Sequence, residues 1–498
     1  MIVDEHGVLE RMCALLPDLG NSRVSPSAYD TACLAMLRSP HGPGPGTPTF
    51  PQCARWLLAR QHDDGSWGGT LPWPRERAVG TLAAVVALAG LTQEGHLPPE
   101  RTAEAIARGT TYLGGIAAAL RDASEDIVAF ELIFPSLLEK ATALGLPLPP
   151  AEFDWLHDLR RRKLRLLQQH RALGHAVHDL EIFDELPPGA VGAQSPDGGF
   201  GCSPAATARV LHDHPNPAAL AYLRRTIDFC GHGAVPTIYP FGIYDRAWVI
   251  ACLQKAGVDL PGMKPHITAL AEAWGPDGVA SESHGLPPDG DDTAMVFTVL
   301  RAAGHDIPAD PLHHFRTPHG YTTYPMEMTA SASCNAHILT ALRAAARPDP
   351  DATQCAHDFL RRTRRADGTW ADKWHISPYY TTACAVESLH GLDDDLCRPA
   401  LTWVLRTQHP DGSWGSSAGN TEETAYALTI LLSTEHPSGA AASRALARGT
   451  TYLARHADDE DHPELWIGKS LYTPLNVVRG LILSTLWRCM QAQPHPGA

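Results

Sequence analysis

The chain has 498 residues, of which 44% are hydrophobic and 19% charged; 55 Asp and Glu against 40 Lys and Arg give a formal net charge of −15. This size allows two or three domains around large cores. Such an acidic chain repels nucleic acid and anionic membranes, which argues against nucleic-acid binding and means that an anionic substrate needs a local group of Lys and Arg.

The N-terminal segment and the cysteines predict a cytoplasmic protein. The first residues, MIVDEHGVLERMCALL, carry acids where an export signal needs bases. The apolar run at 81–91 is too short to span a bilayer, so no membrane span is expected. The 11 cysteines include no C-x-x-C pair, which is typical of reduced thiols and indicates neither a disulfide framework nor a zinc site.

One turn sequence recurs along the chain. QHDDGSWGG at 61–69 is almost identical to QHPDGSWGS at 408–416, and AIARGTTYL at 105–113 is repeated as ALARGTTYL at 445–453. Weaker copies of the turn stand at 195–201, 275–281 and 365–372. Asp-Gly favours a tight turn, and the Trp that follows can pack against the adjacent helix pair. We therefore interpret the motif as a structural fastener.

The segments between these turns predict an all-α fold. Ala- and Leu-rich stretches with helical spacing, such as 293–304 and 423–432, alternate with the turns, and many end at Gly. Few segments alternate with a period of two. Because a repeat near 45 residues is typical of helical hairpins, we expect repeated helix pairs arranged as α/α barrels.

The phrase GLPPDGDDTAMVF, at 285–297, concentrates negative charge at the start of an apolar helical stretch. Asp289, Asp291 and Asp292 fall within four residues. One interpretation is a solvated helix cap, because Asp is favoured at helix N-termini. The other is a proton source: crowded carboxylates cannot all ionise, so the cluster keeps a proton that it can deliver to a substrate.

Together with the repeats, the acidic phrase resembles the class II terpene cyclases, and most closely the labdane-type (copalyl) diphosphate synthases of plants and bacteria within the squalene–hopene cyclase superfamily. The phrases that carry the resemblance are SAYDTACLAML (27–37), FELIFPSLLEKATALGL (130–146), YPFGIYDRAW (239–248), DGDDTAMVFTVLRAAGHDI (289–307) and LWIGKSLYTP (465–474). The resemblance implies two α/α-barrel domains: a γ domain over 41–215, inserted into a β domain made of 1–40 and 216–498.

The resemblance also implies how the proton is delivered. Asp291 would be the general acid, and Asp289 and Asp292 would be its supporting carboxylates. Asn335, in SASCNAHIL, stands where the family places an Asn that hydrogen-bonds the acid.

For the base that ends the reaction, the resemblance is incomplete. Plant enzymes of the family use a His–Asn pair to position the deprotonating water. His178 matches the His, but Thr237 stands at the Asn position, and Tyr472 is a second candidate by position. The stereochemistry and skeleton of the product therefore stay open.

The diphosphate end of the substrate needs cations. The resemblance points to Lys163 and Lys469, with Lys373 as a third candidate, and to Mg²⁺ held with the help of Glu125 or Asp126. Aromatic faces stabilise a carbocation without offering a lone pair. The aromatic residues expected to line the substrate cavity include Tyr239, Tyr244, Trp248, Trp374 and Tyr380.

We therefore expect a class II diterpene cyclase that converts geranylgeranyl diphosphate into a bicyclic labdane-type diphosphate, copalyl-like or rearranged to a halimane or clerodane skeleton. Neither DDDLC (393–397) nor DDEDH (458–462) completes the D-D-x-x-D motif of class I enzymes, so the diphosphate should be retained. A downstream class I terpene synthase or phosphatase would then consume the product.

Three alternatives remain open at this stage. The same chemistry on farnesyl diphosphate would give a drimane-type product. A non-enzymatic α/α-repeat scaffold would bind a protein or peptide instead. An α/α-barrel prenyltransferase subunit would need a zinc-binding set of Asp, Cys and His.

Overall fold

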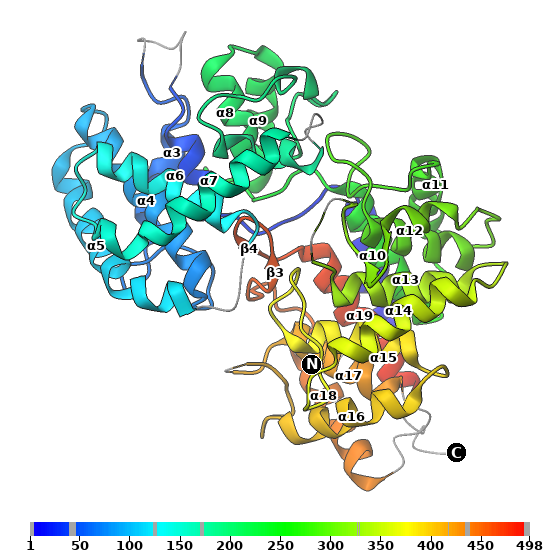
Figure 1. Ribbon diagram of the computed structural model, residues 1–498. Helices are drawn as coiled ribbons and strands as arrows, with labels where there is room; N and C mark the ends of the chain where they lie inside the picture. The colour runs from blue at the N-terminus through cyan, green and yellow to red at the C-terminus, as the bar shows by residue number, and fades with distance from the viewer. Residues whose placement is uncertain are drawn as a thin grey trace.

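The structure is a computed structural model that describes residues 4–38, 46–122, 127–169, 174–325, 327, 329–416, 418–433 and 439–492. Over these residues the chain is mostly helical, as expected, and its named strands form two short antiparallel hairpins. The hairpins are β1 (Arg316–Thr317) with β2 (Gly320–Tyr321), and β3 (Trp466–Ile467) with β4 (Leu471–Tyr472). Figure 1 shows two helical lobes with the β3–β4 hairpin between them.

Two hydrophobic cores divide the chain. The larger core contains buried residues from 8–24 and 241–489, and the smaller core contains buried residues from 28–235. The boundaries expected after residues 40 and 215 do not coincide with this division, because the helices on either side of the expected insertion pack inside the smaller core. The β3–β4 hairpin adds Ile467 and Leu471 to the smaller core.

The larger core lies inside a ring of helices. Each inner helix contacts the next and the last contacts the first, which closes the ring. In order, the inner helices are α10 (Gly242–Lys255), α12 (Gly290–Ala302), α13 (Ala332–Ala344), α15 (Pro378–Leu389), α17 (Thr421–Leu432) and α19 (Leu475–Ala492). Outside them pack α1 (Glu5–Leu15), α11 (Met263–Ala273), α14 (Pro350–Thr363), α16 (Asp394–Thr407) and α18 (Ala440–Arg455). This arrangement is the expected α/α barrel.

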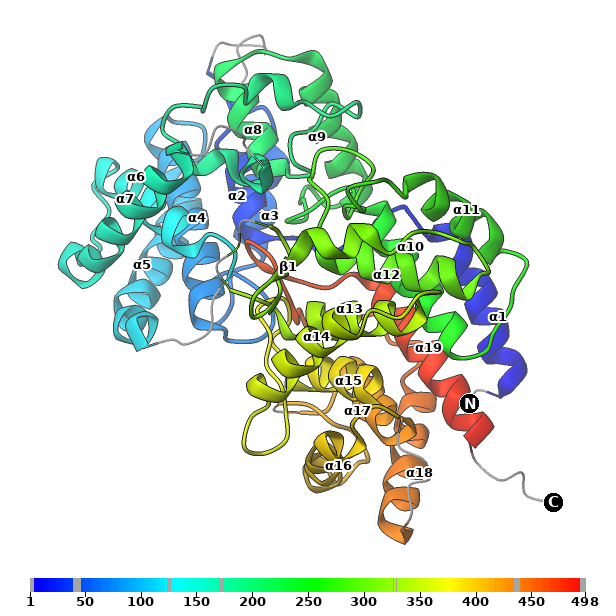
Figure 2. The same ribbon diagram turned by 45° about the vertical axis from the view of Figure 1, so that its right-hand side comes forward.

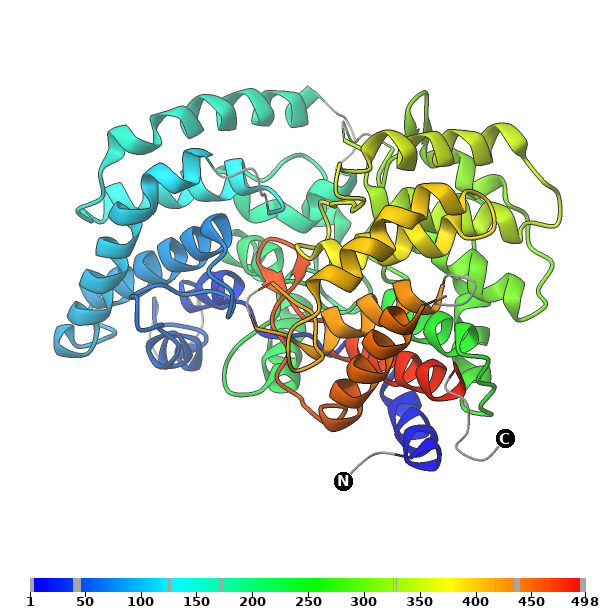
Figure 3. The ribbon, with the colours of Figure 1, turned by 90° about the horizontal axis from the view of Figure 1, so that it is seen from below.

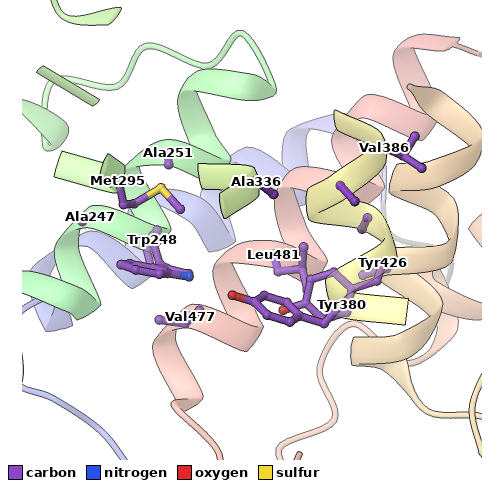
Figure 4. Close-up of a cluster of buried hydrophobic side chains, with 14 of the residues drawn as sticks. Ala247, Trp248, Ala251, Met295, Ala336, Tyr380, Val386, Tyr426, Val477 and Leu481 are labelled. Atoms are coloured by element: carbon purple, nitrogen blue, oxygen red, sulfur yellow. The ribbon is translucent and has the colours of Figure 1, made fainter. Parts of the chain in front are cut away.

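The interior of this ring is filled by side chains from every inner helix. Figure 4 shows Trp248, Met295, Tyr380 and Tyr426 directed toward one another, with Leu481 beside them. All of them are at most 8% exposed. The barrel is therefore packed along this part of its axis, and any substrate site must lie toward an end of it.

The smaller core lies inside a second ring of the same kind. Its inner elements are α2 (Ala28–Ala35), α4 (Pro74–Gln93), α6 (Phe130–Ala143), η3 (Gly174–Ile182) and α8 (Pro204–Asp213). Its outer helices are α3 (Pro51–Ala59), α5 (Pro99–Asp122), α7 (Asp154–Gln169) and α9 (Pro217–Cys230). One inner position is thus taken by η3, a 3₁₀ segment in which Asp179 has non-helical torsions (φ −118°, ψ 31°).

Further 3₁₀ turns connect these helices. They are η1 (Leu16–Asp18), η2 (Pro150–Phe153), η4 (Val191–Ala193) and η5 (Asp310–Phe315). Figure 2 shows α1 beside α19, so the two ends of the described chain meet on the larger barrel. Figure 3 shows the two barrels side by side, with the β3–β4 hairpin at their junction.

The first copy of the repeated turn fastens two helix pairs of the smaller barrel. The fully buried Trp67 donates its indole N–H to the Leu57 carbonyl at the end of α3, at 2.7 Å. Gln61 Nε2 donates both to Gly65 in the turn and to Ala105 on α5, each at 2.9 Å. The turn therefore joins the end of one helix to the side of another.

The second copy repeats these bonds in the larger barrel. Trp414 Nε1 donates to the Val404 carbonyl at 2.8 Å, and Gln408 Nε2 donates to Gly412 and to Ala445 at 2.9 Å each. Ala105 and Ala445 belong to the two copies of the duplicated A-R-G-T-T-Y-L helix. The two duplicated phrases thus bind each other, which confirms the fastener interpretation.

Within the part of the chain that the structure describes, no helix combines the length and the apolar character needed to cross a membrane. All 11 cysteines are free thiols.

Candidate active site

A cavity of about 1130 Å³ lies between the two barrels. The smaller barrel contributes residues of α6, α7 and η3 to its wall, and the larger barrel contributes residues near the N-termini of α10, α12 and α15. Both strands of the β3–β4 hairpin line it as well. The N-terminal ends of these inner helices therefore carry the side chains that face a substrate.

The acidic phrase begins helix α12 inside this cavity. Asp289 is the N-cap: its Oδ1 accepts the backbone N–H of Asp291 at 3.0 Å and of Asp292 at 2.8 Å. Asp289 and Asp292 are only 2% and 3% exposed. One carboxylate therefore caps the helix, but it does so inside the protein, and the phrase is not a solvated turn. We call Asp289, Asp291 and Asp292, with the adjacent His337, the acid cluster.

Two carboxylates of the acid cluster, Asp289 and Asp292, are shifted toward their neutral forms. Burial, reinforced by the negative charges of Asp292 and Asp291, raises the pKa of Asp289 well above its usual range. Burial also raises the pKa of Asp292 to about 6, although hydrogen bonds from Asp289 and Ser281 oppose it. These directions are the ones expected of a cluster that retains a proton.

His337, on α13, contacts the central carboxylate. Its Nδ1 lies 2.6 Å from Asp291 Oδ1. Burial alone lowers the pKa of His337, but the charge of Asp291 outweighs it, and the pKa rises to about 10. His337 was not among the predicted site residues; the signal for it in the sequence is its position in SASCNAHIL, on the helix that packs against α12.

Asn335 does not contact the acid, contrary to expectation. Its Oδ1 accepts the Tyr321 N–H at 2.9 Å, and its Nδ2 donates to the carbonyls of Tyr321 and Ser331 at 2.8 and 2.7 Å. Residues two positions apart on an α-helix point about 200° apart. Asn335 therefore faces β2, while His337 faces Asp291.

Aromatic side chains form much of the cavity wall. They are Trp73, Phe241, Tyr244, Trp248, Tyr324, Trp374, Trp466 and Tyr472. Trp248 stacks on Tyr244 with ring centroids 4.1 Å apart and meets the His337 ring edge-on at 5.7 Å. The acid cluster therefore borders an aromatic surface. Trp73 and Trp466 were not among the predicted lining residues, although Trp466 belongs to the same phrase as Tyr472.

Two of the predicted aromatic residues are not part of this wall. Tyr239 packs its ring against Phe229 at 5.0 Å, on the side of the smaller barrel. Tyr380 is 2% exposed and stacks on His375 at 4.5 Å inside the larger barrel. Both belong to the hydrophobic packing around the site. The phrases that resemble the family contain both kinds of residue, so the sequence could not tell a packing residue from a residue of the cavity wall.

Cationic side chains also line the cavity. Lys163 is paired with Glu131, and Lys373 Nζ lies 2.7 Å from Glu327. Arg365, which the sequence analysis did not single out, lines the cavity too. The cavity wall therefore carries three cationic side chains, two of which are paired with carboxylates.

Lys469 is placed differently from expectation. It is fully buried, and its Nζ donates to Glu181 and Ser203, each at 2.7 Å, and to the His178 carbonyl at 3.0 Å. A lysine has three N–H donors, and these acceptors use all three. Asp30 Oδ1 lies 3.8 Å away. We call Asp30, Asp179, Glu181 and Lys469 the lysine cluster.

The remaining predicted residues have mixed outcomes. His178 lines the cavity with its Nδ1 2.6 Å from the Gly201 carbonyl, and Tyr472 lines it with a pKa that burial raises. Glu125 and Asp126, the proposed metal ligands, lie outside the described residues. Among the residues that are described, no three His, Cys, Asp or Glu side chains are grouped to hold a metal ion.

Comparisons with known proteins show the family to which the chain belongs. The squalene-hopene cyclase C-terminal domain family matches residues 325–468. Over 488 residues the chain is 36% identical to the ent-copalyl diphosphate synthase of Streptomyces sp. (strain KO-3988), covering 93% of this chain and 92% of that protein. Over 496 residues it is 32% identical to the type B diterpene cyclase of Mycobacterium tuberculosis (strain ATCC 25618 / H37Rv), covering 94% and 96%.

The fold agrees as well. The solved structure of ent-copalyl diphosphate synthase from Streptomyces platensis superposes with a TM-score of 0.80 at 31% identity, covering 98% of this chain and 99% of that one. The protein is thus an enzyme of the terpene cyclase class with two α/α barrels. Within that class, the chain belongs to the bacterial class II diterpene cyclases.

Proposed function

We propose that the enzyme protonates the terminal alkene of geranylgeranyl diphosphate and cyclises it to a bicyclic labdane-type diphosphate. The observation that carries the proposal is the position of Asp291. It stands at the N-terminus of α12, with two buried carboxylates beside it, His337 at 2.6 Å and an aromatic cavity in front of it. Relatives named as copalyl and labdadienyl diphosphate synthases support this choice of reaction.

In this proposal two opposing effects make Asp291 an acid. Burial and like charges keep a proton on the acid cluster, since the carboxylates cannot all ionise together. The positively charged His337 stabilises the carboxylate that remains after the proton has left. Because His337 binds Oδ1, Oδ2 is the oxygen that delivers the proton to the alkene.

Cyclisation then proceeds in the aromatic part of the cavity. Protonation leaves a tertiary cation, and the next two alkenes attack in turn to close two rings. The faces of Trp248 and Tyr244 stabilise positive charge without a lone pair that would capture it. The cation that remains next to the second ring must lose a proton to give the product alkene.

The diphosphate is held and not cleaved. Lys163, Lys373 and Arg365 provide the positive charge around the cavity that the acidic chain otherwise lacks. Mg²⁺ remains part of the proposal: Glu125 and Asp126 would help to hold it, and it would offset charge on the phosphates.

The volume of the cavity is large enough for the longer substrate. At about 1130 Å³ it exceeds the roughly 300–1,000 Å³ of most small-molecule sites. A C20 prenyl chain therefore fits in it, and we keep geranylgeranyl diphosphate as the proposed substrate. We further propose a cytoplasmic enzyme whose product passes to a class I terpene synthase or a phosphatase.

A product assay tests the proposal. Purified protein with Mg²⁺ is given geranylgeranyl and farnesyl diphosphates separately, and the products are dephosphorylated and identified by gas chromatography–mass spectrometry. We expect a bicyclic C20 alcohol that is absent with Asp291→Ala. A bicyclic C15 alcohol alone would show that the substrate is farnesyl diphosphate and that the proposed reaction is correct. Linear alcohols alone from folded protein would refute the proposal.

A further inference from the structure

Asp179 lines the cavity from the smaller barrel, whereas the acid cluster belongs to the larger one. Its side chain is 7% exposed, and Oδ1 is buried without a hydrogen-bond partner among the described residues. The non-helical torsions of Asp179 interrupt η3 at this residue. An unpartnered buried carboxylate is costly, so its retention at a cavity wall calls for a role.

The other carboxylates of the cavity wall each have at least one partner, although Asp292 Oδ1, like Asp179 Oδ1, has none of its own among the described residues. The partners are Lys163 for Glu131, backbone N–H groups for Asp289, His337 for Asp291, Ser281 for Asp292, Lys373 for Glu327, and Ser331 with Ser333 for Asp372. Asp179 is thus the lining carboxylate, within the described chain, that no donor holds. Hydrogen bonds from donors stabilise the ionised form of a carboxylate. A carboxylate without a donor therefore binds a proton more tightly than a hydrogen-bonded carboxylate in the same surroundings.

Burial, modified by the charges around Asp179, raises its pKa. Burial raises the pKa to about 7; Lys469 opposes this effect, while Glu181 and Asp30 add to it. His178 is its neighbour in the chain and also lines the cavity. At neutral pH Asp179 is therefore divided between carboxylate and acid, which suits a group that must accept and then release a proton.

We propose that Asp179 is the base that ends the cyclisation. Its carboxylate takes a proton from a carbon next to the last carbocation, and the electron pair of that C–H bond becomes the product alkene. Asp291 gives one proton and Asp179 accepts one, so substrate and product are isomers. Exchange with water returns both groups to their starting states. This inference rests on the proposed function and assigns its final step.

The two predicted bases suit this step less well. Burial raises the pKa of Tyr472, so it stays a neutral phenol, which is a weak base. The Nδ1 of His178 lies 2.6 Å from the Gly201 carbonyl, which leaves Nε2 as the acceptor of this ring, and a neutral imidazole lacks the negative charge of a carboxylate. In a cavity otherwise walled largely by aromatic and aliphatic groups, Asp179 offers an anionic lone pair that no donor shares.

Replacement of Asp179 by Asn tests the role in the full-length enzyme. Asn keeps the shape and removes the base, so the cation should still form and then capture water or lose a different proton. We expect the wild-type alkene to fall at least tenfold relative to hydroxylated or isomeric bicyclic products, as measured by gas chromatography–mass spectrometry. Asp184→Asn, which changes a carboxylate two residues beyond η3 that is 71% exposed and paired with Arg160 outside the cavity wall, should leave the product ratio unchanged.

A pH profile separates a base from a structural role. In the wild type, formation of the alkene should decline as the pH falls below about 7, because protonated Asp179 cannot accept a proton. This decline should disappear in Asp179→Asn. Asp179→Glu, which retains a carboxylate, should restore most of the wild-type alkene.

Several results would overturn the inference. These are a wild-type product ratio and pH profile in Asp179→Asn, loss of every bicyclic product from folded Asp179→Asn, or a changed product in His178→Gln but not in Asp179→Asn. If circular dichroism shows that Asp179→Asn does not fold, Asp179→Ala takes its place with the same readouts. A wild-type enzyme without bicyclic product would instead refute the proposed function.

Discussion

The acid cluster and the lysine cluster each combine three carboxylates with one basic side chain, but they are assembled in different ways. The carboxylates of the acid cluster come from four consecutive residues, and the helix itself orients them. Those of the lysine cluster come from α2 and η3, and the lysine comes from the β3–β4 hairpin near the other end of the chain. A short sequence motif can therefore predict the carboxylates of the acid cluster, whereas the lysine cluster forms only when distant segments of the chain come together in the fold.

The two basic residues also do different work. A buried lysine with three acceptors is a fixed charge that compensates its neighbours. A histidine can change its charge and can share a proton with the carboxylate that it contacts. The comparison predicts that damage to the acid cluster affects turnover, while loss of the lysine affects stability.

The largest effect is expected from Asp291→Asn. The side chain keeps its size but has no acidic proton, so formation of bicyclic product should fall about 10³-fold. The measurement is product yield per enzyme by gas chromatography–mass spectrometry. The matched control is Asp259→Asn, an exposed site between α10 and α11, which should retain wild-type turnover. Equal losses in the two variants would contradict the role of the acid.

The lysine cluster should respond through folding. Lys469→Met keeps much of the side-chain volume but leaves Asp30, Asp179 and Glu181 without their cation. We expect the free energy of unfolding to fall by about 3–5 kcal/mol, measured by urea denaturation. Lys264→Met changes an exposed lysine on α11 and should cost less than about 0.5 kcal/mol. A loss below about 1 kcal/mol for Lys469→Met would show that the cluster does not need its lysine.

His337→Gln should slow the reaction without preventing it. Gln still donates a hydrogen bond to Asp291 but carries no positive charge, so we expect kcat to fall about 10²-fold. The KM for substrate should change little, because His337 acts through the acid. A variant with raised KM and unchanged kcat would place His337 in substrate binding instead.

The contact between His337 and Asp291 also predicts that the stability of the protein depends on pH. The pKa of His337 is raised from 6.5 to about 10 in the folded protein, so the stabilisation is fully present below pH 6.5 and is lost as the pH rises through 10. We expect a loss of about 2 kcal/mol over this range relative to His337→Gln, from urea denaturation at both pH values. Parallel curves for the two proteins would contradict the ion pair.

Much of the fold could be predicted from the sequence because its signals are local. Helical periodicity and the duplicated turn predicted α/α barrels, and the structure confirms that the chain forms two of them. Asp289, Asp291 and Asp292 stood out for the same reason. The residues at which the two cores divide could not be predicted from the sequence. They depend on which barrel α2 and α9 pack against, and contacts between distant parts of the chain decide that.

Residues whose role depends on direction were harder to predict. Asn335 and His337 occupy one phrase, and only the rotation of α13 decides which of them meets Asp291. Lys469 lies in a phrase that resembles the family, but the phrase does not show what the lysine binds. Its acceptor Glu181 lies 288 residues earlier in the chain. Asp179 carried no pattern at all, because its distinguishing feature is the lack of a donor.

The β3–β4 hairpin has a consequence for how the protein is made. Residues 28–235 of the smaller barrel leave the ribosome long before the hairpin does, and until it arrives their barrel lacks Ile467, Leu471 and the cation for its buried carboxylates. Domains usually fold as units during synthesis, the N-terminal one first. Here the first barrel to be synthesised reaches its complete core only when one of the last segments of the chain emerges, so its final packing comes late in synthesis.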